Sequence, residues 1–209
     1  CGNNDPREVM RRTLEIAERT RRPILYGPRR EPSDWPLAEQ LALLRSGDVF
    51  TYCFHSDAES IVADGEVVDS AWEARERGVL FDVGHGKGTE DMGVGPAAIA
   101  NGFLPDTISS DVYNNHLGWN PPHDLARTLS RMITIGMPET EALRQSTLRP
   151  AEILGMSGQI GTLAPGADAD LAVLHWSDPV PLARVNGDIK CGPCLEPILT
   201  VRAGSIIGR

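Results

Sequence analysis

The segments Leu80–Gly86 (Leu-Phe-Asp-Val-Gly-His-Gly) and Leu104–Asp111 (Leu-Pro-Asp-Thr-Ile-Ser-Ser-Asp) decide how this chain folds. Each is a short apolar run that ends in ionisable side chains, among them His85 and Asp111. An apolar run of this length after a helical pattern predicts a buried parallel strand. Ionisable residues at the carboxyl ends of such strands lie where α/β folds place their chemistry. His85 and Asp111 are therefore the first candidate site residues.

The composition limits the class of protein. The chain has 209 residues, enough for one domain and part of a second, and a net charge of -9, which argues against nucleic acid and anionic membranes as partners. It contains no run of 18 apolar residues and no visible signal peptide. Four cysteines are too few for a disulfide scaffold and predict a reducing, cytoplasmic location: Cys1, Cys53, Cys191 and Cys194.

Helical patterns and short apolar runs alternate along the first three quarters of the chain. We expect helices at 6–21, 36–44, 70–77, 94–101, 125–135, 138–147 and 150–154, strands at 23–26, 48–54, 79–83 and 107–110, and a hairpin at 61–68. This alternation predicts right-handed βαβ units and a parallel sheet. After Gly158, a strand at 169–174 and a strand pair at 198–207 predict a small β unit beside the α/β part.

Several segments resemble the amidohydrolase superfamily. Ile160–Leu174 (IGTLAPGADADLAVL) resembles the signature around which the superfamily's small β-sandwich re-forms, and Arg149–Gly155 resembles the helix that precedes it. The strand ends at 81–86 and 106–111 resemble the subgroup that includes dihydroorotase-like deacetylases. The resemblance implies that residues 1–157 are the C-terminal half of a (β/α)8 TIM-like barrel, strands five to eight. Residues 158–209 would then be the C-terminal part of a composite β-sandwich domain.

The same resemblance implies one or two divalent metals, usually zinc, at the C-terminal face of the barrel. Tyr26 and Tyr52 stand where the fifth-strand and sixth-strand histidines are expected, and only the eighth-strand aspartate, Asp111, is retained. A phenol, with a pKa of ~10, is a poor zinc ligand at neutral pH, and one carboxylate cannot build a zinc site. His55, three residues after Tyr52, could stand in for the missing sixth-strand histidine, but a strand would place His55 and Tyr52 on opposite faces. We therefore expect no cofactor and no metal ligands within this chain.

Half a barrel leaves two unpaired strand edges. We therefore expect a partner that supplies four strands: an N-terminal half from the same precursor, a separate subunit, or a second copy in a higher oligomer. Cys1 would lie near the rim of the site and carries both a thiol and an α-amine, as in N-terminal nucleophile hydrolases. Self-cleavage before Cys1 is one explanation for its position, and a proteolytic nick or a chosen chain boundary is the other.

Further candidates follow from position. Asp111 is expected to transfer protons or to cap the next loop, and His85 to contact substrate, carry a proton or bond into the rim. Tyr26 and Tyr52 orient a substrate carbonyl or fill the volume of a lost metal. The remaining substrate-binding candidates are His55 and Asn114 with its neighbours Asn115 and His116. Arg29 and Arg30 either bind a substrate carboxylate or form a solvated pair in a loop. His175 is expected to be structural, and Cys191–Cys194 (CGPC) to be a disulfide or a loop turn rather than a redox dithiol.

Three functions remain open. The first is a hydrolase of amide or cyclic amide C–N bonds of small molecules that is metal-independent or metal-poor and is active only with its complementary half. The second is a catalytically silent homologue that acts as a scaffold or regulatory subunit. The third is a fragment of a metal-dependent deacetylase, against which the two tyrosines count.

Overall fold

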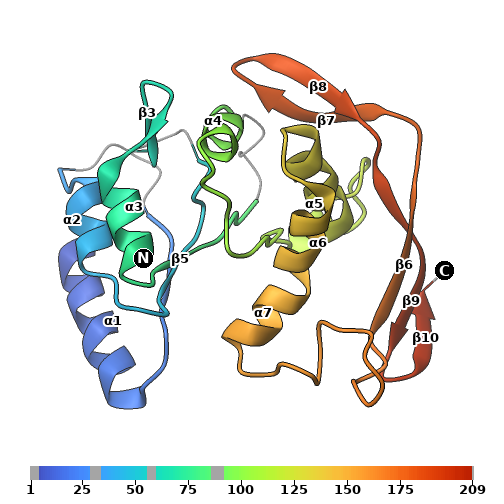
Figure 1. Ribbon diagram of the computed structural model, residues 1–209, viewed down its shortest axis with the longest axis horizontal. Helices are drawn as coiled ribbons and strands as arrows, with labels where there is room; N and C mark the ends of the chain where they lie inside the picture. The colour runs from blue at the N-terminus through green and yellow to red at the C-terminus, as the bar shows by residue number, and fades with distance from the viewer. Residues whose placement is uncertain (1–4, 29–33, 56–59, 86–91, 209) are drawn as a thin grey trace.

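Three neighbouring strands at the centre of the α/β part run parallel. They are β1 (Leu25–Tyr26), β2 (Val49–Phe50) and β5 (Leu80–Phe81), hydrogen-bonded in that order. Leu25 pairs with Val49, and Val49 in turn with Leu80. The computed structural model describes residues 5–28, 34–55, 60–85 and 92–208 (Figure 1). The expected parallel sheet is confirmed by this register.

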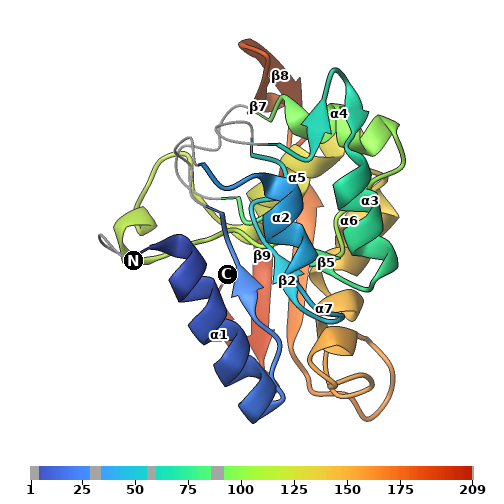
Figure 2. The same ribbon diagram turned by 90° about the vertical axis from the view of Figure 1, so that its left-hand side faces the viewer.

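Helices connect these strands as the sequence predicts. α1 (Pro6–Thr20) begins where the Asp5 carboxylate accepts a hydrogen bond from the Arg7 amide at 3.0 Å, and it ends at Arg21 in the left-handed conformation. α2 (Leu37–Ala42), α3 (Asp69–Glu76) and α4 (Val94–Ala100) follow in turn. Figure 2 shows α1, α2 and α3 on one side of the strands. The hairpin of β3 (Val62–Ala63) and β4 (Glu66–Val67) is also confirmed.

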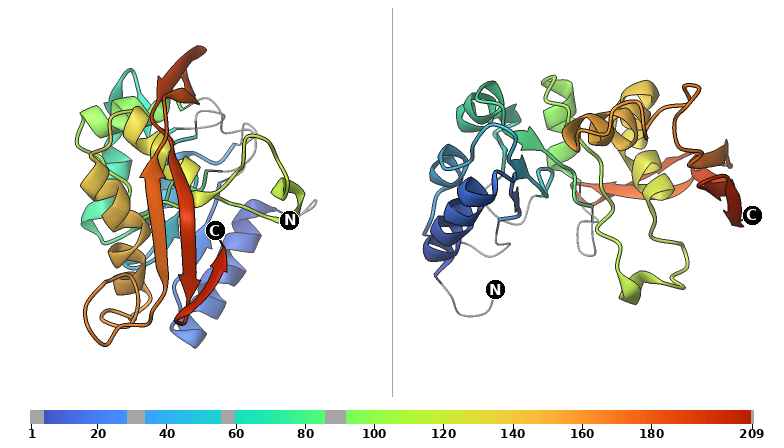
Figure 3. Two further views of the ribbon diagram at one scale, coloured as in Figure 1. Left: turned by 90° about the vertical axis from the view of Figure 1, so that its right-hand side faces the viewer. Right: turned by 90° about the horizontal axis from the view of Figure 1, so that it is seen from below.

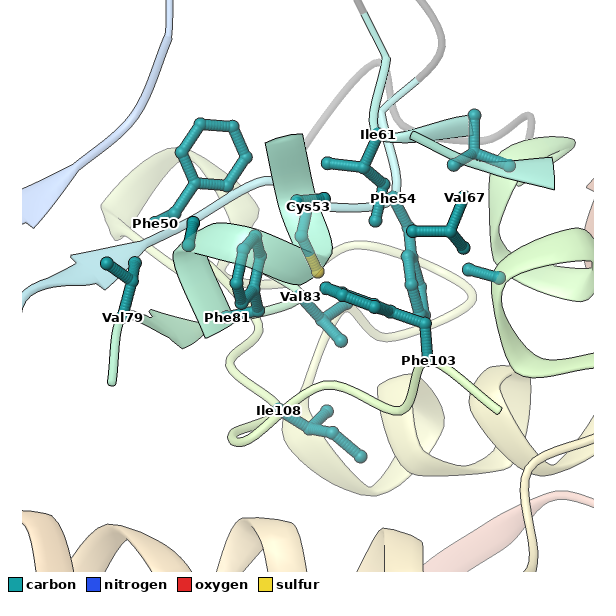
Figure 4. Close-up of a cluster of buried hydrophobic side chains, with 14 of the residues drawn as sticks. Phe50, Cys53, Phe54, Ile61, Val67, Val79, Phe81, Val83, Phe103 and Ile108 are labelled. Carbon is teal, nitrogen blue, oxygen red and sulfur yellow. The ribbon is translucent and has the colours of Figure 1, made fainter. Parts of the chain in front are cut away.

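Aromatic rings pack among aliphatic side chains in the core between sheet and helices (Figure 4). Phe81 is fully buried and lies edge-on to Phe103, with ring centroids 4.8 Å apart, while the Phe50 ring lies 5.7 Å away on its other side. Trp72 of α3 contacts Phe103 at 4.9 Å. Edge-to-face contacts of this kind add to the hydrophobic gain of burial and fix the rings relative to one another.

The strands are shorter than expected, because the chain turns directly after each one. Tyr52 has φ +62° and Gly84 has φ +55°, so regular pairing stops at Phe50 and soon after Phe81. The strand expected at 107–110 is reduced to one parallel bridge, Asp82 with Thr107. The amides of Val83 and His85 nevertheless bond the carbonyls of Thr107 and Ser109, so this segment lies beside β5 as a fourth member.

The C-terminal part adds two antiparallel sheets. After α5 (Leu125–Thr134), α6 (Glu139–Ser146) and α7 (Leu148–Ile153), β6 (Leu171–Trp176), β9 (Leu195–Arg202) and β10 (Ser205–Gly208) form one sheet. Figure 3 shows these strands side by side. A second hairpin, β7 (Val180–Val185) and β8 (Asp188–Gly192), was not predicted, although its Asn186–Gly187 turn carries the residues that a two-residue hairpin turn requires.

The β7–β8 hairpin and β9 pack on α5. The Ser130 hydroxyl oxygen accepts a bond from the Leu195 amide at 2.7 Å, and Arg127 and Arg131 donate to the carbonyls of Pro181 and Leu182 at 2.9 and 2.8 Å. The three side chains are spaced three and four residues apart, so these contacts lie on one face of α5, and Figure 1 shows the β7–β8 hairpin next to this helix. A division of the chain at residue 158 stays a prediction.

Of the two expectations for the cysteine pair, a disulfide or a loop turn, the structure supports the loop turn. Cys191 is exposed near the end of β8 and Cys194 is buried just before β9, and both are free thiols. The disulfide interpretation is therefore wrong, and the segment between the two cysteines links β8 to β9. Within the ranges that the structure describes, no helix has the length and apolar character needed to cross a bilayer.

A buried ion pair at the amino ends of the strands gives a first prediction. Asp48 is fully buried, and its carboxylate accepts bonds from the Ile24 amide at 3.0 Å, the Arg45 amide at 2.8 Å and the Arg45 guanidinium. We expect Asp48→Asn to lower the free energy of unfolding by about 2 kcal/mol, less than for a fully buried pair because Arg45 stays partly exposed. Urea unfolding measures the change.

The pKa of Asp48 predicts how its contribution to the free energy of unfolding changes with pH. Although burial alone would raise it, the bonds from Arg45 and the two amides hold the pKa of Asp48 below its ordinary value. Its contribution is therefore present above pH ~4 and is lost as the pH falls further, so wild type loses this stability on acidification and Asp48→Asn does not. Asp34→Asn, in the exposed pair with Arg7, is the control and changes stability by less than about 0.5 kcal/mol. Equal losses in both variants would contradict the assignment.

Candidate active site

A buried carboxylate joins three strand ends at the carboxyl edge of the sheet. Asp82 is 4% exposed; its Oδ2 accepts bonds from the hydroxyls of Thr51 and Ser109, and its Oδ1 accepts one from Thr107, each at 2.7 Å. An ionised carboxylate only accepts, and three hydroxyl donors satisfy it without another charge. Asp82 therefore fixes the end of β2 and the 107–111 segment relative to β5.

Tyr52 and Asp111 directly follow segments that this network holds, Tyr52 after Thr51 and Asp111 two residues after Ser109. The Tyr52 hydroxyl is 3.4 Å from Asp111 Oδ2, a long hydrogen bond between residues 59 positions apart. Both residues have positive φ, +62° for Tyr52 and +47° for Asp111, which is uncommon for residues other than glycine. Strained backbone of this kind is concentrated at functional sites, so the pair is the centre of the candidate site.

Two glycines make room for the Tyr52 ring. A Cβ on Gly27 would lie 2.8 Å from Tyr52 Cε2, and a Cβ on Gly84 would lie 2.7 Å from Tyr52 Cδ1 and would also meet the Thr51 hydroxyl. The ring thus approaches the backbone that follows β1 and the backbone that follows β5. Any larger residue at either glycine would displace the ring.

His55 lies against Tyr52, contrary to expectation. Their rings meet edge-on with centroids 5.2 Å apart, and the His55 amide bonds the Tyr52 carbonyl at 3.0 Å. The prediction of opposite strand faces is wrong, because the chain turns at Tyr52 instead of continuing as a strand.

Tyr26 is hydrogen-bonded to a residue of α2 and not to Asp111. Its hydroxyl donates to Gln40 Oε1 at 2.5 Å, and Gln40 in turn donates to the Trp35 carbonyl at 2.6 Å. Burial raises the pKa of Tyr26 to about 12, so the phenol stays protonated. Since a hydroxyl has one proton to donate, this structure places Tyr26 in contact with α2 and does not pair it with Asp111.

His85 is buried at the rim of the site. It is 2% exposed, and burial, together with Arg131, His123 and His55, lowers its pKa to about 3. The imidazole is therefore neutral at physiological pH. Arg131 Nη1 contacts His85 Nε2, and the ring lies 5.9 Å from that of His123.

The segment after Asp111 contributes an aromatic cluster. Asn114 begins the short 3₁₀ helix η1 (Asn114–His116) and is exposed, as is Asn115. His116 is 2% exposed, with ring centroids 4.0 Å from Tyr113, 4.6 Å from Trp119 and 4.5 Å from His123. The cluster shapes the segment that carries Asp111.

Some predicted residues cannot be placed in this geometry. Cys1 and Arg29, with Arg30, lie outside the described residues, and their roles stay predictions. His175 lies in β6, 3.6 Å from Glu196 and far along the chain from the strand ends. The sequence analysis did not identify Asp82, His123 or Arg131 as functional residues. Asp82 could have been identified, because it is a charged residue inside the apolar run Leu80–Val83.

The donor set of the described residues does not fit the zinc site that the resemblance implies. In the described ranges, no three His, Cys, Asp or Glu side chains are grouped so that they could hold a metal ion. The Tyr26 hydroxyl is used by Gln40, and Tyr52 offers Asp111 a proton, which a ligand carboxylate does not need. We derive no chemistry through a metal from these residues.

Comparisons with known proteins agree on one family. The profile of the Amidohydrolase family matches residues 87–202. A deacetylase of Enterococcus faecalis is 34% identical over 81% of this chain and 47% of its own length, and a deacetylase of Brucella anthropi is 31% identical over 73% and 38%. The chain thus spans about half, or less, of the length of these curated relatives.

Solved structures give the same picture. Crystal structures of an adenine deaminase and of a dihydroorotase each match with a TM-score of 0.78, at 29% and 28% identity. They cover 94% and 95% of this chain, which covers 54% of each of them. These similarities indicate a fold of the TIM-barrel type and confirm that coarser part of the prediction.

The glycine beside Tyr52 gives a prediction. We expect Gly84→Ala to lower the free energy of unfolding by about 2 kcal/mol, because alanine adds strain at φ +55° and a methyl group against Tyr52 and Thr51. The control is Gly102→Ala, with φ +80° and open space around its Cβ position, where only the backbone strain of about 1 kcal/mol applies. Urea unfolding of both variants measures the difference, and equal losses would show that the Tyr52 ring is not packed as described.

Proposed function

The chain belongs to the amidohydrolase family, and from this premise we propose that it supplies the C-terminal part of an active site that hydrolyses an amide or cyclic amide C–N bond in a small molecule. The observation that carries the proposal is the contact of Tyr52 with Asp111 at the carboxyl edge of the parallel strands. This edge is where barrel enzymes of α/β type place catalytic groups.

Asp111 is the proton carrier in this proposal. It is exposed at the end of the fourth strand segment, so its carboxylate can reach a water molecule and a bound amide. The Asp111 carboxylate takes a proton from the water molecule while the water oxygen attacks the carbonyl carbon of the amide. The protonated Asp111 then gives that proton to the departing nitrogen as the C–N bond breaks. Atoms and charge balance within one carboxyl group and one water.

Tyr52 has the complementary role. Its neutral hydroxyl donates to Asp111 in the resting site, and the same donor can stabilise the negative charge that develops on the carbonyl oxygen. The ring is held between the backbones at Gly27 and Gly84, so the hydroxyl needs little reorganisation.

We propose that the described strands are the C-terminal half of the family's barrel, completed by another polypeptide segment. The order β1-β2-β5 with the Thr107 bridge ends at β1 on one side, and Leu25 of β1 is 71% exposed. An apolar edge of this kind is normally paired or covered. The covering segment would also bring the groups that complete the site.

A second candidate is a portion of a metal-dependent deacetylase. The relatives that are named deacetylases, and the half-length match to them, favour it. In that case metal ligands would come mainly from outside this chain, with Asp111 as the contribution of the present residues. The silent homologue predicted from sequence is the third outcome, to be recognised by absence of turnover.

Removal of the proposed proton carrier tests the first candidate. We expect Asp111→Asn to lower kcat/KM for N-acetyl amides or cyclic amides by at least about 100-fold, because the amide cannot accept the proton. Asp178→Asn, an exposed carboxylate between β6 and β7, is the control and leaves turnover unchanged. Equal activity of both variants would overturn the role of Asp111, and no hydrolysis by wild type across the panel would favour the silent homologue.

Removal of metal separates the two enzymatic candidates. For a site without metal, prolonged chelation leaves kcat/KM unchanged, and elemental analysis finds less than one divalent ion per chain. Loss of activity on chelation with recovery on adding zinc would instead support the deacetylase candidate. The thermal midpoint measured alongside shows whether chelation has merely unfolded the protein.

A further inference from the structure

Arg131 connects the C-terminal hairpin with the candidate site. It projects from α5, and its Nε donates to the Leu182 carbonyl of β7 at 2.8 Å while its Nη1 contacts His85 Nε2. One guanidinium therefore bridges a hairpin and a strand end that lie about 100 residues apart in the sequence. A forked, planar donor can make both contacts at once.

We propose that Arg131 is a positioning residue that holds His85 as its neutral Nδ1–H tautomer and, through His85, fixes the backbone that presents Asp111. The proposal rests on the proposed function only in naming Asp111 as the residue that benefits. Neither residue is required to contact substrate.

The tautomer of His85 follows from the fact that Arg131 can only donate hydrogen bonds. A guanidinium carries only N–H donors, so the nitrogen it contacts, Nε2, must be the acceptor. The one proton of a neutral imidazole then resides on Nδ1. Burial opposes a second proton on His85, and among the described residues positive charge on Arg131, His123 or His55 acts in the same direction. His85 is thus a fixed structural group and cannot serve as a base through Nε2.

The path from His85 to Asp111 is short. The His85 amide bonds the Ser109 carbonyl at 2.9 Å, and the neighbouring His123 bonds the Ser110 carbonyl through Nε2 at 2.7 Å. The centroids of the two imidazole rings lie 5.9 Å apart, and the two residues bond the carbonyls of Ser109 and Ser110, which precede Asp111. The His85 backbone and the His123 ring thus both hold the segment from which Asp111 projects at φ +47°, and the contact from Arg131 fixes His85 beside that segment.

Arg127 provides a matched control on the same helix. It lies one turn before Arg131 and donates to the Pro181 carbonyl at 2.9 Å, so it also docks the hairpin on α5. Among the described residues its guanidinium contacts the Pro181 carbonyl and, at 3.8 Å, the Cys194 Sγ, and not His85. A difference between the two arginine variants therefore reports on His85 and not on hairpin docking.

The experiment is a ¹⁵N spectrum of the histidine side chains, recorded on the intact protein between about pH 5 and 8. His85→Gln identifies the His85 signals by their loss, among the five histidines of the chain. In wild type and in Arg127→Met, we expect His85 as Nδ1–H with no titration over this range. In Arg131→Met, we expect the Nε2–H form or a titration within the range.

The outcomes are distinct. An Nε2–H or charged His85 in wild type, or an Arg131→Met spectrum identical to wild type, would overturn the proposal. If Arg131→Met does not fold, Arg131→Lys retains the charge but cannot reach both partners, and the same change in tautomer is expected. Because the readout is spectroscopic, a protein without amidase activity would refute the proposed function and leave this inference standing.

Discussion

The Asp82 carboxylate is the interaction on which the carboxyl edge of the sheet depends. Regular strand pairing in this part extends over only two residues per strand, so backbone hydrogen bonds alone hold the strand ends weakly. Three hydroxyls, from Thr51, Thr107 and Ser109, bond one buried carboxylate and thereby replace the missing ladder. Bonds to an ionised acceptor are stronger than those between neutral groups, and a buried network that is fully satisfied rigidifies its surroundings.

The geometry of Tyr52 and Asp111 follows from that support. Both residues leave the strands with positive φ, which the backbone tolerates only where the surrounding structure enforces it. Asp82 fixes the residues that precede each of them, Thr51 on one side and Ser109 on the other. Gly27 and Gly84 then admit the Tyr52 ring at van der Waals limits. A long-range contact between two side chains thus arises from local turns on a rigid base.

The C-terminal sheets are tied to the same region through α5. Ser130 and Arg127 dock β9 and β7 on the helix, and Arg131 continues from β7 to His85. The antiparallel part is therefore in physical contact with the rim of the candidate site. This contact gives the antiparallel part a way to influence the carboxyl edge of the parallel strands, the edge at which α/β folds place their chemistry.

Sequence alone determined the alternation of helices and strands as far as α7, the parallel sheet, the hairpin at 61–68 and the family, because periodicity, capping residues and the Ile160–Leu174 signature are local signals. It also indicated Asp111 and Tyr52 as residues at strand ends. Only the tertiary structure decided that Tyr52 meets Asp111 and His55, that Tyr26 turns to Gln40, and that Asp82 and Arg131 hold the site together. These outcomes depend on turns with positive φ and on contacts between residues 14 to 59 positions apart, which no local pattern encodes.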